Sequence, residues 1–181
     1  MNKQDVVAVV SGGPSSEAEV SRRTGGAIAE ALREKGYNAV EVELVPEKLV
    51  EQLREIDAKV VFNAVHGMYG EDGRLQSILE AIKMPYTGSG VLASAVAMDK
   101  VATKRFLISA NISTPKCLMY NKRFDNDMAK IEKEIIATFG VPVVIKAADQ
   151  GSSIGVEIVK AEENIAAALE NTFKYSDLVL V

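Results

Sequence analysis

Short apolar runs alternate with amphipathic stretches along the first half of the sequence. Val6–Val10 is an unbroken Val-rich run, typical of a strand that is buried on both faces. Between Val20 and Leu32, apolar or small residues recur at helical spacing, and Gly36 stands where a C-cap is expected. The alternation continues with predicted strands at 39–44 and 60–65 and predicted helices at 47–56 and 74–82. Short connections between alternating strands and helices predict parallel βαβ units in a doubly wound sheet.

A second pattern begins after Pro115. Two helical stretches, divided near Asp99, cover 91–109 and lead into it. Beyond Pro115 the sequence predicts strands at 116–120, 143–147, 155–159 and 178–181 and helices at 125–139 and 162–173. The predicted fold class is therefore α/β, with a Rossmann-like parallel-sheet domain at 1–97 followed by an α+β lobe at 98–181.

Charge and cysteine content exclude several classes of protein. The 21 Lys and Arg against 25 Asp and Glu give a net charge of −4, which argues against a broad surface for nucleic acid or anionic membrane. The single Cys117 cannot form an internal disulfide, and no signal-peptide pattern opens the chain. The longest apolar runs, such as 91–98, are far shorter than a membrane span. These features predict a cytoplasmic protein.

The stretch "VVSGGPSSEAEVS" at 9–21 runs from a strand through two glycines into a helix. Such a turn can cradle a phosphate, but no P-loop or dinucleotide pattern occurs here. Glu17 and Glu19 suit the positive end of a helix and would repel a phosphate. Two interpretations remain: a capped helix start, with Ser15 or Ser16 as N-cap and Glu17 or Glu19 completing a capping box, or a site for a cation or amine.

The loop "HGMYGEDGRLQ" at 66–76 holds the only histidine of the chain. His66 follows a predicted strand, and ligands of parallel sheets bind at the carboxyl ends of strands. Glu71 and Asp72 lie in the same loop, but two acids alone do not make a metal site. His66 is thus either structural or part of a site. Further on, "TGSGVLA" at 87–93 matches a dinucleotide fingerprint without its acidic partner, so a plain turn is favoured.

The stretch "VIKAADQGSSIGV" at 144–156 places a lysine at the end of an apolar strand and a Gly-Ser-Ser loop after it. Free amides and two hydroxyls in such a loop can cover phosphates, while Lys146 supplies a fixed charge. The alternative is an ordinary hairpin with an exposed lysine.

Taken together, four segments resemble the D-alanine–D-alanine ligases of the ATP-grasp superfamily, over essentially the whole chain and in the same order. The segments are "GGPSSEAEVS", "HGMYGEDGRLQ", "PYTGSGVLASAVAMDKVATK" and "VPVVIKAADQGSSIGV". Two positions depart from the family pattern. Ala147 follows Lys146 where the family often has a proline, and Ala18 follows Glu17 where many relatives have a larger residue.

The resemblance implies a role for each matching residue. Glu17 receives the ammonium of the first D-alanine, and His66 lies near the carboxylate of that substrate or near the reaction intermediate. Ser152 links to Glu17 and helps to order the closing loop. The ATP phosphates are contacted by two lysines and a loop, which comprise Lys100, Lys146, Gly151, Ser152 and Ser153.

The implied activity is the ATP-dependent ligation of two D-alanines through an acyl phosphate, for peptidoglycan precursor synthesis. Magnesium would bridge the phosphates, with ligands expected beyond Val181 and none in this chain. The resemblance also implies a homodimer formed through the N-terminal domain. The 98–181 lobe would be the first part of an ATP-grasp module, so we expect the chain to be the front half of the enzyme and inactive alone.

Two other interpretations of the function stay open. The first is a D-alanine–D-lactate or D-serine ligase, because the choice of the second substrate would depend on residues beyond this chain. The second is a fragment that binds an amino acid or a nucleotide without catalysis.

Overall fold

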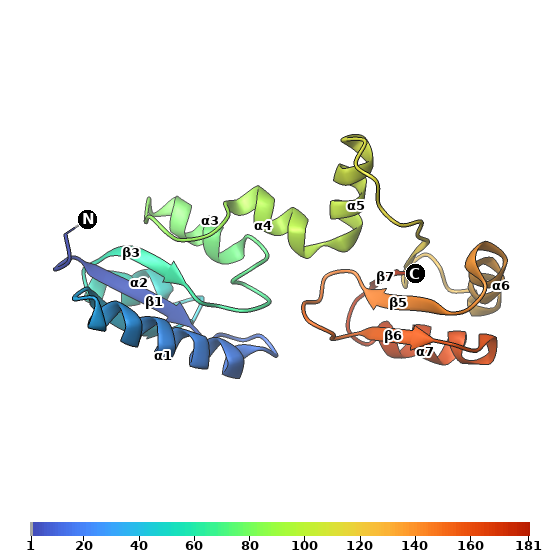
Figure 1. Ribbon diagram of the computed structural model, residues 1–181, viewed down its shortest axis with the longest axis horizontal. Helices are drawn as coiled ribbons and strands as arrows, with labels where there is room; N and C mark the ends of the chain where they lie inside the picture. The colour runs from blue at the N-terminus through green and yellow to red at the C-terminus, as the bar shows by residue number, and fades with distance from the viewer. Residues whose placement is uncertain (1) are drawn as a thin grey trace. The chain divides into compact units, whose positions relative to one another are not determined.

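The computed structural model describes residues 2–181, which separate into two compact units (Figure 1). The first unit ends at Ala95 and the second begins at Val96. The predicted domain boundary at 97/98 lies two residues later.

A three-stranded parallel sheet forms the centre of the first unit. Its strands are β1 (Val6–Ser11), β2 (Asn38–Glu43) and β3 (Ala58–Asn63), in the spatial order β2-β1-β3. Both neighbours run parallel to β1, and Val9 pairs with Glu41 on one side and Phe62 on the other. The predicted parallel α/β domain is confirmed. Because all three strands point the same way, the loops that follow them gather at one edge of the sheet.

Helices cover both faces of this sheet, as a doubly wound fold requires (Figure 1). α1 (Ala18–Glu34) packs its Ala29 against Val9 and Ala39 on one face. α2 (Leu49–Glu55) and α3 (Arg74–Ala81) cover the other face. Their fully buried leucines each stabilise the unit by about 1.5–3 kcal/mol relative to an exposed side chain, and they are Leu49, Leu53, Leu75 and Leu79.

The start of α1 differs from the predicted capping box. Glu17 is the N-cap residue, and its side chain makes no capping hydrogen bond. The Ser15 hydroxyl instead accepts from the Glu17 amide at 3.2 Å and donates to the His66 carbonyl at 2.9 Å. The Ser15 hydroxyl thus accepts from an amide at the start of the helix and at the same time donates to a distant loop. At the other end, Gly36 follows the C-cap with φ +80°, which confirms the predicted helix end.

The second unit contains a four-stranded antiparallel sheet. Its strands are β4 (Met119–Asn121), β5 (Val143–Ala147), β6 (Val156–Val159) and β7 (Leu178–Leu180), in the order β4-β7-β5-β6. α6 (Met128–Phe139), a 3₁₀ turn (Glu162–Asn164) and α7 (Ile165–Thr172) accompany the sheet. Ile135, Ile145 and Leu169 form the centre of its core, so helices pack on one face of the sheet. The predicted α+β lobe is confirmed.

Two helices precede this sheet in the chain. α4 (Val91–Met98) and α5 (Lys100–Ser109) meet at Asp99, as the sequence predicts. The Asp99 carboxylate accepts hydrogen bonds from the amides of Val101 and Ala102 at 2.8 and 3.0 Å. This N-cap fixes the first turn of α5 and therefore the position of Lys100.

Candidate functional site

The glycine turn after β1 already has partners for its amides. The Gly12 amide donates to the Ser21 hydroxyl at 2.8 Å, and the Gly13 amide donates to the Glu43 carboxylate at 3.2 Å. Arg22 holds that carboxylate with two hydrogen bonds of 2.8 and 3.0 Å. The hydrogen bond from Arg22 is the main cause that lowers the pKa of Glu43, so this carboxylate stays charged. A negative group on the Gly13 amide leaves no cradle for a phosphate here.

Glu17 lies directly over the loop that follows β3. Gly67 has φ +69°, and a Cβ placed there would be 2.8 Å from the Glu17 carboxylate oxygen Oε2. Only glycine allows both this backbone conformation and this close approach. The Gly67 amide donates to Glu71 at 2.7 Å, which closes the loop on itself. A carboxylate at the start of α1 is thereby held against the 66–71 loop.

His66 is held from α1 and from the turn before it. Its ring nitrogen Nε2 lies 3.1 Å from the Thr24 hydroxyl, and its carbonyl accepts from Ser15. Ser21, which is fully buried, donates to the Ala64 carbonyl at 2.7 Å. The structure therefore brings the loops carrying Glu17 and His66 into one hydrogen-bonded cluster at the carboxyl edge of the parallel sheet.

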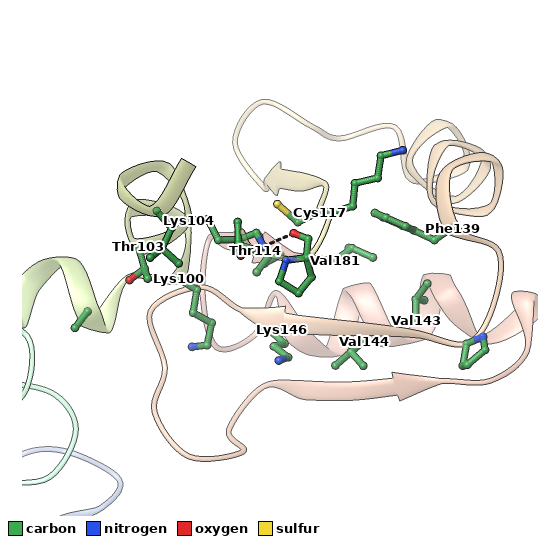
Figure 2. Close-up of a pocket in the computed structure, with 16 residues that line it drawn as sticks. Lys100, Thr103, Lys104, Thr114, Cys117, Phe139, Val143, Val144, Lys146 and Val181 are labelled. Atoms are coloured by element: carbon green, nitrogen blue, oxygen red, sulfur yellow. Dashed lines mark hydrogen bonds between the residues drawn. The ribbon is translucent and has the colours of Figure 1, made fainter. Parts of the chain in front are cut away.

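A pocket of 690 Å³ opens on the second unit (Figure 2). Figure 2 shows Lys100 and Lys146 near one end, with Phe139 and Val143 at the other. The lining also includes apolar side chains from several elements, among them Leu107, Pro142, Val144, Leu180 and Val181. A cationic end joined to an apolar wall suits a ligand that is anionic at one end and flat and apolar at the other.

Lys100 is fixed at the beginning of α5 and reaches the loop after β5. Its ammonium donates to the Gln150 carbonyl at 2.5 Å and to the Ala148 carbonyl at 3.4 Å. Burial, and then the charge of Lys146, lower the pKa of Lys100. Two ammonium groups close enough to perturb one another make this end of the pocket favourable for an anion.

Lys146 comes from the outer face of β5. Strand side chains alternate, so Ile145 enters the core while Val144 and Lys146 lie on the opposite face and line the pocket, which Val143 at the start of the strand lines as well. Beyond Ala147 a loop returns to β6 as an antiparallel hairpin. Gly151, Ser152 and Ser153 lie in that loop and outside the residues that line the pocket. Their contact with a ligand stays a prediction.

Several residues of these clusters were not predicted from the sequence. Lys104 is 8% exposed and donates to the Thr114 hydroxyl at 2.9 Å and to the Pro115 carbonyl at 2.5 Å, beside the pocket. Its spacing of four from Lys100 places both lysines on one face of α5, a signal that could have found it. Ser21 and Thr24 had no comparable local signal, because their partners come from a distant loop.

Residues 2–181 hold neither a three-ligand metal cluster nor a membrane-spanning helix. No three His, Cys, Asp or Glu side chains gather closely enough there to hold a metal ion. None of the helices in that range is both long and apolar enough to cross a membrane.

Comparisons with known proteins agree with this arrangement. Residues 45–89 match the family described as the D-ala D-ala ligase N-terminus, and residues 106–181 match the D-ala D-ala ligase C-terminus. A D-alanine–D-alanine ligase of Moorella thermoacetica is 45% identical over 170 residues, which cover 93% of this chain and 55% of the relative. The Geobacter sulfurreducens ligase is 41% identical and is covered over 54% of its length.

Solved structures show the same likeness. The D-alanine–D-alanine ligase of Bacillus anthracis superimposes with a TM-score of 0.84 and 34% identity, covering 97% of this chain and 56% of that one. A second structure of that ligase, complexed with ATP, gives a TM-score of 0.82, 32% identity and coverages of 97% and 57%.

A doubly wound parallel domain, followed by an antiparallel lobe with a lysine-bearing pocket, is the arrangement of the ATP-grasp ligases. Within that class, the chain belongs to the D-alanine–D-alanine ligase family. It spans about half the length of the curated relatives it matches.

Proposed function

We propose that this chain provides the first-substrate site and part of the ATP site of a D-alanine–D-alanine ligase. The observation that carries the proposal is the shared pocket of Lys100 and Lys146 on the second unit. The reaction is the one catalysed by the D-alanine–D-alanine ligase family, and residues of this chain are assigned to its steps.

The pocket has the size and the chemistry expected for ATP. Its 690 Å³ lies within the usual range of about 300–1,000 Å³ for small-molecule sites. Its apolar wall fits a purine, and the ammonium groups of Lys100 and Lys146 fit phosphates. Burial of Lys100 disfavours its charge, and a phosphate would restore it. The ATP complex of the Bacillus anthracis relative supports the same ligand.

Glu17 is proposed to bind the ammonium of the first D-alanine. Its carboxylate lies against Gly67 at the edge of the sheet where ligands of such folds bind. His66 is assigned to the carboxylate of that substrate or to the intermediate. Ser152 is assigned to ordering the closing loop, and Gly151 and Ser153 to covering the phosphates; these three assignments rest on the family resemblance.

The reaction then has two bond-forming steps. A carboxylate oxygen of the first D-alanine bonds to the γ-phosphorus of ATP, and the bond from that phosphorus to the bridging oxygen breaks to release ADP. The amine of the second D-alanine loses a proton and bonds to the acyl carbon, and phosphate leaves. Fixed positive charge at Lys100 and Lys146 stabilises the phosphates during the first step.

Magnesium is expected in this reaction class, where it neutralises charge on the phosphates. Magnesium that bridges phosphates usually takes one or two carboxylate ligands from the protein, and we expect those ligands beyond Val181.

The remaining proposals concern the setting of the enzyme. A cytoplasmic location is proposed because the reaction uses ATP. A homodimer through the first unit is proposed from the family resemblance. A ligase that uses D-lactate or D-serine as its second substrate remains the alternative activity. A phosphate-release assay on the full-length protein, with each of the three as second substrate, separates these activities.

The ATP assignment is tested by Lys146→Met in the full-length ligase, with Lys160→Met as the matched control. Lys160 is exposed and follows the neighbouring strand β6. Loss of a charged hydrogen bond of about 1.5–3 kcal/mol should weaken ATP binding roughly 10- to 150-fold in K146M. K160M should bind ATP as the parent does. Equal ATP affinity in K146M and the parent would remove Lys146 from the site.

The D-alanine assignment is tested by Glu17→Gln, which keeps the size of the side chain and removes its charge. If the pair with the ammonium is desolvated, the loss should be about 2–5 kcal/mol in binding the first D-alanine. The KM for ATP should stay unchanged. An unaltered apparent affinity for the first D-alanine would refute the role of Glu17.

A further inference from the structure

We propose that Thr24 is a positioning residue that holds His66 as the neutral tautomer with its proton on Nδ1. The hydrogen bond is a feature of the first unit, and its use in catalysis rests on the function proposed above. The loop that carries His66 approaches α1 along one side of the helix. Ser21 and Thr24, three residues apart, both face this loop.

Hydroxyl groups fix the backbone around His66. The Ser21 hydroxyl donates to the Ala64 carbonyl at 2.7 Å, and the Ser15 hydroxyl donates to the His66 carbonyl at 2.9 Å. With both carbonyls fixed, the orientation of the imidazole depends on its own contacts. Nε2 lies 3.1 Å from the Thr24 hydroxyl, which is the hydrogen bond that sets the ring.

The direction of that hydrogen bond follows from the other partners of Thr24. A threonine in a helix often donates its hydroxyl proton to the carbonyl four residues earlier, here that of Val20. No such bond occurs among the hydrogen bonds of residues 2–181, although the equivalent bond from Ser77 to Gly73 does, at 2.7 Å. In the proposed arrangement the Thr24 proton is donated to Nε2, which is then the unprotonated nitrogen.

A neutral imidazole carries one proton, so an accepting Nε2 places it on Nδ1. His66 then offers an N–H donor without carrying a charge. Such a donor suits the carboxylate of an amino acid or the oxygens of an acyl phosphate. A donor fixed before the reaction stabilises developing negative charge without reorganisation. Thr24 contributes by acting through His66, and it is assigned no contact with substrate.

The proposal can be tested by ¹⁵N NMR, because His66 is the only histidine in the chain. Couplings between the ring nitrogens and the carbon-bound protons show which nitrogen is protonated. We expect Nδ1–H in the parent chain at alkaline pH, where an imidazole is neutral. Protonated Nε2 in the parent would overturn the proposal without any variant.

Variants then show whether Thr24 causes the preference. Thr24→Val removes the hydroxyl at similar size and should shift the population toward the Nε2–H tautomer, and Thr24→Ser should restore Nδ1–H. Thr87→Val is the matched control, because Thr87 lies in the same unit and its hydroxyl accepts from the Asn63 amide at 3.1 Å. It should leave the tautomer unchanged. An unchanged tautomer in T24V would overturn the role of Thr24.

The catalytic part is tested separately in the full-length ligase. T24V should lower the turnover rate about ten-fold, T24S should recover it, and the KM for ATP should not move. Parent-like turnover in T24V, together with a shifted tautomer, would overturn the catalytic part. Absence of D-alanine-dependent turnover in the parent would overturn the proposed function, while the NMR result would still stand for the hydrogen bond.

Discussion

Replacing Gly67 with alanine should have two separate effects. It should lower the stability of the first unit, and it should displace the carboxylate of Glu17, which is proposed to bind the amine of the substrate. At φ +69° an alanine is strained by about 1–2 kcal/mol. Its Cβ would also lie 2.8 Å from Oε2 of Glu17, which is too close for the carboxylate to stay in place. Because that oxygen ends a flexible side chain, the carboxylate can move away from the new Cβ without a shift of the backbone. The backbone strain therefore dominates the loss of folding free energy.

Gly36→Ala is the matched control for this strain. Gly36 has φ +80°, and a Cβ there would meet nothing closer than Lys3, at an ordinary 3.8 Å. It lies at the other end of the 17-residue helix α1, about 25 Å from Glu17. We expect both variants to lose about 1–2 kcal/mol, which lowers the melting temperature by roughly 4–8 °C for each kcal/mol in a unit of this size. Thermal or denaturant unfolding of the chain measures this loss.

The two variants should differ in activity. In the full-length ligase, a displaced Glu17 loses a charged hydrogen bond to the ammonium of about 1.5–3 kcal/mol. The apparent affinity for the first D-alanine should therefore fall roughly 10- to 150-fold in G67A, and it should be unchanged in G36A. Steady-state kinetics at saturating ATP measures the difference. If both variants keep the affinity of the parent, Glu17 does not bind the ammonium as reasoned here.

Three further predictions concern other contacts. Glu43→Gln should cost little stability at pH 7, because solvent screens the half-exposed pair with Arg22. Since the folded pKa of Glu43 is lowered, its contribution is present above the unfolded pKa of about 4.3 and is lost as the pH falls through the folded value. The parent and E43Q should therefore unfold alike at strongly acidic pH, and a persistent gap would contradict this sign. Lys104→Met removes the hydrogen bonds to Thr114 and Pro115 and should therefore destabilise the chain by about 1–3 kcal/mol. Denaturant unfolding measures this loss, and a variant as stable as the parent would contradict the prediction. Cys117 lines the pocket, so bound ATP should shield its thiol from alkylation. In the full-length ligase, ATP at ten times its Kd should lower the alkylation rate to about a tenth of the rate without ATP. An unchanged rate would place ATP elsewhere.

Local patterns in the sequence were enough to predict the order and type of the elements. The Val-rich run at 6–10 became β1, the helical spacing at 20–32 became α1, and β5 begins and ends where predicted. Periodicity carries this information because each element must present its apolar side chains to a core. Boundaries moved by one to three residues elsewhere, as for β4, which begins at Met119 instead of 116.

The contacts of the site depended on tertiary structure. From the sequence, Ser15 could be the N-cap; in the structure the N-cap residue is Glu17, and the Ser15 hydroxyl also donates to the distant His66 carbonyl. The sequence already argued against a phosphate at the glycine turn, and the Glu43 carboxylate on the Gly13 amide agrees with that. Glu17 and His66 were candidates from their places after predicted strands, and the resemblance supplied their roles. Their cluster forms because parallel strands end at one edge of the sheet. Thr24 had no local signal at all. Its partner lies 42 residues away in the chain, and a contact at that separation is formed only when the sheet and α1 pack together.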